Sequence, residues 1–284
     1  MTADPKTIER DGVTLAYQVT GEGETPLLFV NAWFTDLVAQ WRQPRLRSFL
    51  QRLGTFASVI SVDKRGVGRS SRVPADALPG IDTKVADLLA VLDALGKGRV
   101  AVLGTSESGP LTAALAARHP DRVAALVLHA TRAKYGAPAP DYPYGYGEDE
   151  LAPYVEWYER GWGSEAFAAE FYAWVAPSVA ADRAEIDAFV ELMPVAGDAA
   201  TVAAATRLTY ATTDVRDALP SIACPTLVIG RTGDPVTPVE EVRWLADHIP
   251  GATLVVVKGD DHPIWAGDAA TVADRIEAFV VGRG

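Results

Sequence analysis

The chain has 284 residues, of which 49% are hydrophobic and 22% charged, and its formal net charge at pH 7 is −11. This composition excludes an intrinsically disordered chain, and the acidic balance argues against nucleic acid or an anionic membrane as the main partner. The single cysteine, Cys224, excludes an intramolecular disulfide, and no apolar run is typical of a signal peptide or a membrane span, so we expect a cytoplasmic protein.

Short runs of Val, Ile and Leu alternate with longer amphipathic segments along most of the chain. A hairpin over 7–10 and 14–19, with Asp11-Gly12 as its turn, comes first. Further strands are predicted at 27–30, 58–62, 100–103, 125–128, 226–229 and 253–257, and helices at 84–95, 111–117, 239–248 and 269–281. Continuous apolar strands separated by helices are typical of a parallel sheet covered on both faces, so the predicted fold class is α/β.

The alternation stops over residues 131–215, where no strand pattern appears. This segment holds 14 of the 24 aromatic residues, and it carries 14 acidic residues against five basic ones. Because strand patterns resume at Thr226, we interpret 131–215 as a helical cap inserted into a core domain made of 1–130 and 216–284.

The strongest local motif follows the strand at 100–103, where Gly104-Thr-Ser106-Glu-Ser108-Gly leads into a helix. A serine on a sharp strand-to-helix turn with small neighbours is a nucleophile elbow, usually written Gly-x-Ser-x-Gly. Ser108 replaces the second glycine but is small enough for the turn to form. We therefore expect Ser106 to be a nucleophile; the alternative is an ordinary loop that happens to contain serines.

A nucleophilic serine needs a base, and the chain has four histidines. His119 and His248 fall at predicted helix ends, where a capping role is the simpler interpretation, and His129 ends a strand. His262 instead lies in the polar loop that follows the last predicted strand. It is the candidate general base.

An acid that orients this base is expected after the preceding strand. Asp234 fits, because the strand at 226–229 leads into a Gly-Asp-Pro turn at the edge where sites of parallel sheets lie. The alternative is a turn aspartate that bonds its own backbone. Asp260 and Asp261 precede His262 directly, and we expect them to be surface charges, because adjacent side chains rarely meet.

The oxyanion formed in such a reaction needs two backbone donors. We expect the N–H of Glu107, directly after the nucleophile, to be one. The N–H of Trp33, in the loop after the strand at 27–30, is the second candidate. The alternative for that loop is a strand end with aromatic core residues.

Two other motifs are discounted. Ser61-Val-Asp-Lys64 matches the Ser-x-x-Lys of β-lactamases, but it begins on a strand and leads into a turn, so we expect no catalytic role for Lys64. Gly66-Val-Gly68 lacks the third glycine of a dinucleotide site, and no cluster has metal-ligand spacing. We therefore expect no cofactor and no metal.

Together, the elbow, the Asp-Lys-Arg-Gly turn, Gly-Asp-Pro and Gly-Asp-Asp-His resemble the α/β-hydrolase superfamily over about residues 7–281. The chain order Ser106, Asp234, His262 matches that of the family. Ser-Glu-Ser-Gly-Pro is similar to the Ser-Glu-Gly-Gly-Pro variant in hydrolase modules that some bacteria fuse to adenylate cyclases. The resemblance implies an eight-stranded, mostly parallel sheet flanked by helices, with a helical cap, and hydrolysis through an acyl-serine.

The sequence thus predicts a serine hydrolase acting on a carboxylic ester or lactone of a small, neutral, apolar or aromatic substrate. Cap aromatics would bury such a ligand and cap acids would repel an anion, unless the aromatics only pack the cap on the sheet. The same triad could instead serve C–C bond hydrolysis or perhydrolysis, and the scaffold could bind a ligand without catalysis. We expect a small-molecule substrate, and neither nucleic acid nor a membrane as a partner. The chain is expected to be a monomer or a homodimer.

Overall fold

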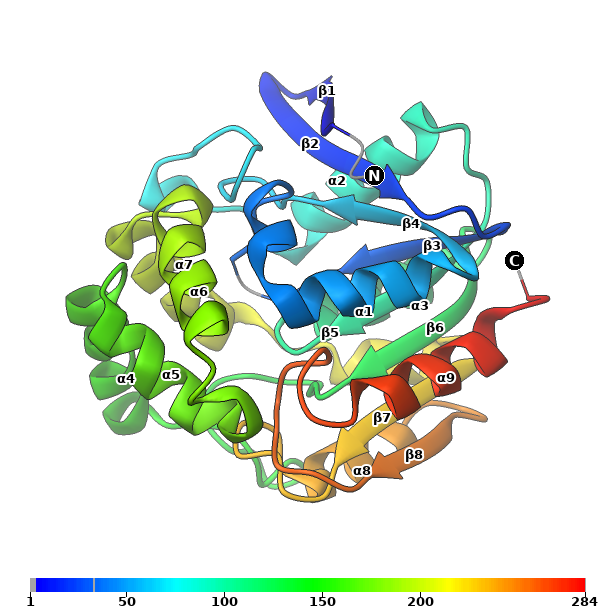
Figure 1. The fold of residues 1–284 in the computed structure, drawn as a ribbon. Coiled ribbons are helices and arrows are strands. Elements are labelled where there is room, and N and C mark those ends of the chain that lie inside the picture. Colours follow the sequence, from blue (N-terminus) through cyan, green and yellow to red (C-terminus); the bar gives the residue numbers. More distant parts are fainter. Residues whose placement is uncertain (1–3, 33, 284) are drawn as a thin grey trace.

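A computed structural model describes residues 4–32 and 34–283. Its centre is one eight-stranded sheet in the order β1-β2-β4-β3-β5-β6-β7-β8 (Figure 1). The strands are β1 (Lys6–Arg10), β2 (Val13–Thr20), β3 (Thr25–Val30), β4 (Ala57–Val62), β5 (Val100–Thr105), β6 (Val123–His129), β7 (Thr226–Arg231) and β8 (Thr253–Val257). Strand β2 is antiparallel to β1 and β4, and the pairs from β4 to β8 are parallel. The predicted mostly parallel, eight-stranded α/β fold is confirmed.

Helices cover both faces of this sheet. Successive side chains of a strand point to opposite faces, so the apolar residues of each strand divide between two clusters. Leu27 and Phe29 of β3 belong to one cluster, and Leu28 and Val30 belong to the other. The first cluster contains α1 (Pro44–Gly54) and α9 (Ala269–Val280). The second contains α2 (Ile81–Ala94), α3 (Ser108–Arg118) and α8 (Val239–Asp247). Of these helices, only α1 is absent from the sequence prediction.

Four more helices lie between β6 and β7 in the chain, and Figure 1 shows them gathered on one side of the sheet. They are α4 (Glu148–Gly161), α5 (Glu165–Val175), α6 (Arg183–Ala196) and α7 (Ala199–Thr212). Residues 131–215, all of which are described, contribute no strand to the sheet. Most of their aromatic side chains, among them Tyr158, Phe167 and Phe189, belong to the same apolar cluster as α1 and α9, whereas Tyr142 belongs to the second cluster. We call 131–215 the inserted segment; its interpretation as a cap domain remains a proposal.

Among the described residues, no single helix has the length and apolarity of a membrane span. Helices α6 and α7 meet those criteria only when taken together, as a pair bent by 84°.

The sheet brings the predicted site residues to one edge, because the carboxyl ends of parallel strands lie together. Ser106 follows β5, Asp234 follows β7 and His262 follows β8. Strands β5, β6 and β7 are consecutive neighbours, and β8 lies beside β7.

Candidate active site

Ser106 occupies a strained turn between β5 and α3. Its φ angle is +49°, in the left-handed region that non-glycine residues rarely adopt. The Ser106 N–H donates to the carbonyl oxygen of His129 at 3.0 Å, and the Gly109 N–H donates to the Ser106 carbonyl oxygen at 3.0 Å. These bonds to the neighbouring strand and to the first turn of α3 hold the serine in this conformation.

Two glycines make room for the turn. A Cβ atom at Gly104 would lie 2.0 Å from Oγ1 of Thr112, and one at Gly109 would lie 2.0 Å from Oγ1 of Thr131. The crowded positions are therefore two before and three after the serine. Ser108, the departure from the usual motif, lies at a position where the turn accepts a side chain.

The structure brings the three predicted residues of the triad into contact. Nε2 of His262 lies 2.7 Å from Oγ of Ser106, and Nδ1 of His262 lies 3.0 and 2.9 Å from the two carboxylate oxygens of Asp234. Asp234 also accepts the N–H groups of Val236 and Thr237, at 2.8 and 3.0 Å. Asp234 thus bonds its own turn, as the alternative interpretation has it, and also contacts the imidazole; its role as the orienting acid stays a prediction.

Arg231, at the end of β7, organises the loop that carries His262. Its side chain is fully buried, and its guanidinium donates to the carbonyl oxygens of Asp261, Pro263, Ile264 and Ala266. The backbone N–H of His262 donates to the carbonyl oxygen of Val175, at 2.7 Å, in the inserted segment. Sequence reasoning missed Arg231; the only signal was a charged residue at the end of an apolar strand.

The two acids before His262 differ from one another. Asp260 is exposed, as expected, but the surface position expected for Asp261 is wrong, because this residue is only 3% exposed. Its carboxylate accepts the N–H of Ser178 at 3.0 Å, in the short helix η3 (Pro177–Val179). Asp261 is buried because it satisfies a backbone donor of the inserted segment.

One of the two predicted oxyanion donors lies within the described residues. Glu107 directly follows Ser106 and precedes α3, so its N–H belongs to the start of that helix. Trp33 lies outside the described residues. The carbonyl oxygen of Asn31, two residues earlier in the same loop sequence, accepts hydrogen bonds from Oγ of Ser108 at 2.7 Å and from Nζ of Lys64 at 3.3 Å.

Lys64 joins these two loops. Its Nζ donates to Oε2 of Glu107 at 2.7 Å and to Oγ of Ser108 at 2.8 Å. Burial raises the pKa of the Glu107 carboxyl, but the charges of Lys64 and Lys84 outweigh it and hold the net pKa below its ordinary value. Lys64 does not contact Ser106 itself, so the structure gives it a supporting place beside the elbow that sequence reasoning missed.

The ring of His129 makes none of these contacts, although its carbonyl oxygen accepts the Ser106 N–H. His129 is fully buried, and neither ring nitrogen has a hydrogen-bond partner within residues 4–32 and 34–283. Burial, followed by the charge of Arg231 and by His262, lowers the pKa of His129 well below its ordinary value, so the ring is neutral at pH 7. His248 lies 2.7 Å from the Trp244 carbonyl oxygen at the end of α8, as a helix-end residue.

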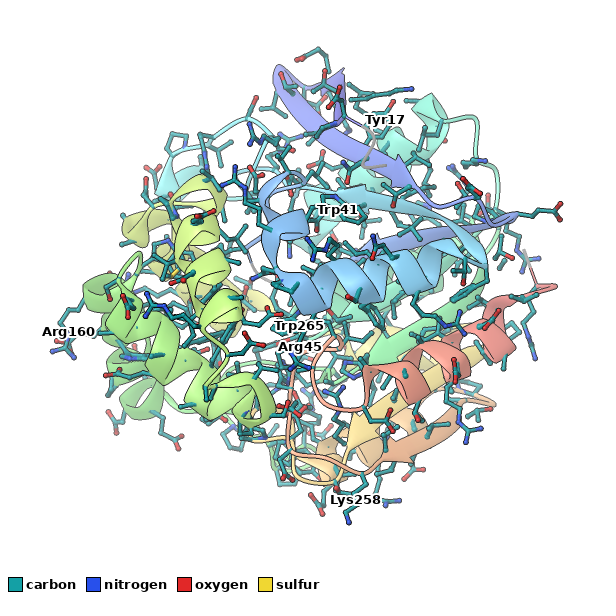
Figure 2. The ribbon with its side chains drawn as sticks, in the orientation of Figure 1. Tyr17, Trp41, Arg45, Arg160, Lys258 and Trp265 are labelled. Carbon is teal, nitrogen blue, oxygen red and sulfur yellow. The ribbon has the colours of Figure 1, made fainter. Side chains whose placement is uncertain are left out.

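A cavity of about 140 Å³ opens beside Ser106 and His262. The inserted segment contributes most of its aromatic wall: Tyr154, Tyr158, Trp162, Phe171, Tyr172, Trp174 and Phe189. Trp265, labelled in Figure 2 between the inserted helices and the sheet, also lines it. Of the lining residues that the structure describes, none is Asp, Glu, Lys or Arg.

No group of three or more His, Cys, Asp or Glu residues is placed to hold a metal ion in the described parts of the chain. The chemistry that the site offers is that of a hydrogen-bonded serine, imidazole and carboxylate beside an apolar cavity.

Comparisons with known proteins show to which family the chain is similar. Residues 25–266 match a family model described as the alpha/beta hydrolase fold. The chain is 30% identical to 3-oxoadipate enol-lactonase 2 of Acinetobacter baylyi over 253 residues, 89% of this chain and 88% of that protein. It is 28% identical to the pimeloyl-[acyl-carrier protein] methyl ester esterase of Nitrosomonas europaea, over 69% and 74% of the two chains. A crystal structure of a hydrolase from Pseudomonas aeruginosa superposes with a TM-score of 0.78 at 27% identity, covering 98% of this chain and 99% of that one.

Proposed function

Since the chain belongs to the α/β-hydrolase family and is a hydrolase, we propose that it cleaves a carboxylic ester or lactone through an acyl intermediate on Ser106. The observation that carries the proposal is the chain of contacts from Ser106 Oγ to His262 and on to Asp234. The names of two relatives, an enol-lactonase and a methyl ester esterase, support these two bond types.

The proposed first step uses the 2.7 Å contact between Ser106 and His262. With His262 protonated on Nδ1, that N–H donates to Asp234 and leaves Nε2 free to take the serine proton. Ser106 Oγ then bonds to the carbonyl carbon, and the leaving alkoxide takes the proton from Nε2. Water repeats the sequence on the acyl-serine: its proton passes to His262, and the acid leaves as Ser106 regains a proton.

The developing oxyanion would accept hydrogen bonds from the N–H groups of Glu107 and Trp33. For Trp33, the second donor, this remains a prediction from the sequence. Lys64 supports the first donor, because it holds the Glu107 side chain and the carbonyl of Asn31 together. Fixed donors of this kind stabilise the transition state without reorganising during the reaction.

The cavity supports a small, neutral, apolar or aromatic substrate. Its wall is aromatic, and the described lining carries no acidic or basic side chain other than His262. Burying an unpaired carboxylate there would cost several kcal/mol, whereas an apolar group gains about 25 cal/mol per Å² removed from water. The alternative is that the aromatics only pack the inserted segment on the sheet. It accounts for aromatic residues such as Phe167, which belong to the apolar cluster but do not line the cavity.

Reaction with a fluorophosphonate probe tests the proposed nucleophile. We expect the wild-type chain and Ser108→Ala to be labelled and Ser106→Ala to remain unlabelled. Ser106→Ala should also lose on the order of 10⁴- to 10⁶-fold in kcat on p-nitrophenyl acetate. Absence of labelling in the wild type would favour a non-catalytic binding protein, and labelling without turnover of any ester or lactone would favour C–C bond hydrolysis or perhydrolysis.

A further inference from the structure

One polar side chain in the cavity wall has no place in the proposed mechanism. Gln40 lines the cavity, is 3% exposed, and its Nε2 has no hydrogen-bond partner in the described parts of the chain. A buried amide donor left unpaired is unusual in a folded protein, because it has lost its water without gaining a replacement.

The backbone holds Gln40 firmly in this position. It lies on the short helix η1 (Ala39–Arg42), and Asp36 lies just before the start of this helix. The Asp36 carboxylate accepts the N–H groups of Val38 and Ala39 at 2.9 and 2.8 Å, and its carbonyl oxygen accepts the N–H of Gln40 at 3.0 Å. The amide is therefore carried on a fixed turn of the wall.

Other donors in the same wall already have partners. Gln43 Nε2 donates to the hydroxyl of Tyr172 at 3.3 Å, and Thr35 donates to Asp63 at 2.6 Å. The hydroxyls of Tyr154 and Tyr158 lie 3.0 Å apart and bond to each other. Gln40 differs from these residues, because its Nε2 has no partner in the described parts of the chain. The atom itself is covered in the wall, so a ligand reaches it only when the side chain turns toward the cavity.

We propose that Gln40 is a specificity-determining residue, which donates from Nε2 to a neutral oxygen acceptor that the substrate carries in addition to its scissile ester. A ketone, an ether or a second carbonyl group fits this site. A carboxylate does not, because the described lining offers it no cation. This inference rests on the proposed ester or lactone hydrolysis and narrows its substrate class to oxygen-bearing, uncharged molecules.

The test compares ester pairs of equal length that differ by one ketone. One pair is p-nitrophenyl heptanoate and its 5-oxo analogue, and the other is hexyl acetate and its 5-oxo analogue, so that both halves of the substrate are probed. A site built around a donor discriminates against the analogue that lacks the acceptor. We expect the wild type to favour the ketone in at least one pair by about 5- to 100-fold in kcat/KM.

Gln40→Met keeps the length of the side chain and removes the donor. We expect it to abolish the ketone preference while changing kcat/KM for the plain ester less than about threefold, which also shows that the variant folds. Gln40→Glu, a second variant of the same size, should lose the preference too. Gln43→Met is the matched control, and it should keep the preference, because its amide already serves Tyr172.

A ketone preference that is absent from the wild type, or that survives in both Gln40 variants, would overturn the assignment while leaving ester hydrolysis intact. Failure of the proposed function looks different: the wild type would then turn over neither member of either pair. Should both Gln40 variants fail to fold, the same ratio measured with Gln40→Asn, whose shorter amide withdraws from the cavity, decides the question.

Discussion

Replacing Lys64 by methionine tests the buried ion pair behind the elbow. The side chains of Lys64 and Glu107 are 5% and 8% exposed, and their charged atoms lie 2.7 Å apart. Lys64→Met removes this contact together with the bonds to Ser108 and Asn31, and it leaves the Glu107 carboxylate buried. We expect a large loss of stability, because the remaining charge is then poorly compensated.

The size of the loss follows from what remains around Glu107. Breaking one side of a buried pair costs about 3–5 kcal/mol. Lys84 stays at 3.7 Å from the other carboxylate oxygen, and the one Ser108 hydroxyl proton can turn from Asn31 to Oε2, which lies 3.1 Å from Oγ, so we expect a value near the lower end, about 3 kcal/mol. Removing both charges, in Lys64→Met with Glu107→Met, should recover most of this loss, because no unpaired charge is left.

Urea unfolding at pH 7 measures these differences through the midpoint and the slope. Lys84→Met is the matched control, since its Nζ lies farther from Glu107 and its side chain is 19% exposed; it should cost less than about 1 kcal/mol. A loss below about 1 kcal/mol for Lys64→Met, or a double variant no more stable than the single one, would refute this reasoning. If the Glu107 N–H is an oxyanion donor, as proposed, steady-state kinetics on p-nitrophenyl acetate should show a fall in kcat with little change in KM.

Four further predictions concern the rest of the site. Asp234→Asn should lower kcat for ester hydrolysis by about 10⁴-fold, whereas Asp260→Asn should leave steady-state rates nearly unchanged. Arg231→Met should lower Tm and kcat together, because the four carbonyl oxygens it serves lose their donor; thermal unfolding and kinetics at constant pH check this. Because the pKa of His129 is lowered in the folded chain, the unfolded chain binds a proton there at a higher pH than the folded chain does. The free energy of unfolding should therefore fall by up to about 1.4 kcal/mol per pH unit below pH 6.5. The fall in the urea midpoint from pH 7 to pH 5 should be smaller in His129→Leu than in the wild type. A carboxylate-bearing ester should react more slowly than a neutral one of equal size, and because the uncharged cavity wall is not screened, part of that difference in kcat/KM should persist at 1 M salt.

The strands, and the three side chains that meet at their ends, could be predicted because their signals are local. Buried parallel strands are continuous apolar runs, and Ser106, Asp234 and His262 each lie in the loop or turn that follows one. Helix α1 could also have been predicted, since Leu46, Phe49, Leu50 and Leu53 recur with the helical period and are all buried.

Other features depend on contacts between distant parts of the chain. Lys64 meets Glu107 across 43 positions, and Asp261 is buried by Ser178, 83 positions away. Arg231 reaches carbonyl oxygens 30 to 35 residues later. Composition and periodicity describe each residue and its near neighbours, so they carry no information on which loops the fold brings together.

The shared apolar cluster of the inserted segment and the sheet has a consequence for cooperativity and for engineering. Tyr158, Phe167 and Phe189 belong to the same cluster as Phe49 of α1 and Ile276 of α9. Deleting the inserted segment would therefore strip apolar cover from the face of the sheet that α1 and α9 protect. Transplanting the segment from another protein would succeed only where the donor supplies matching aromatic surface, and heat should melt both parts in one transition rather than two.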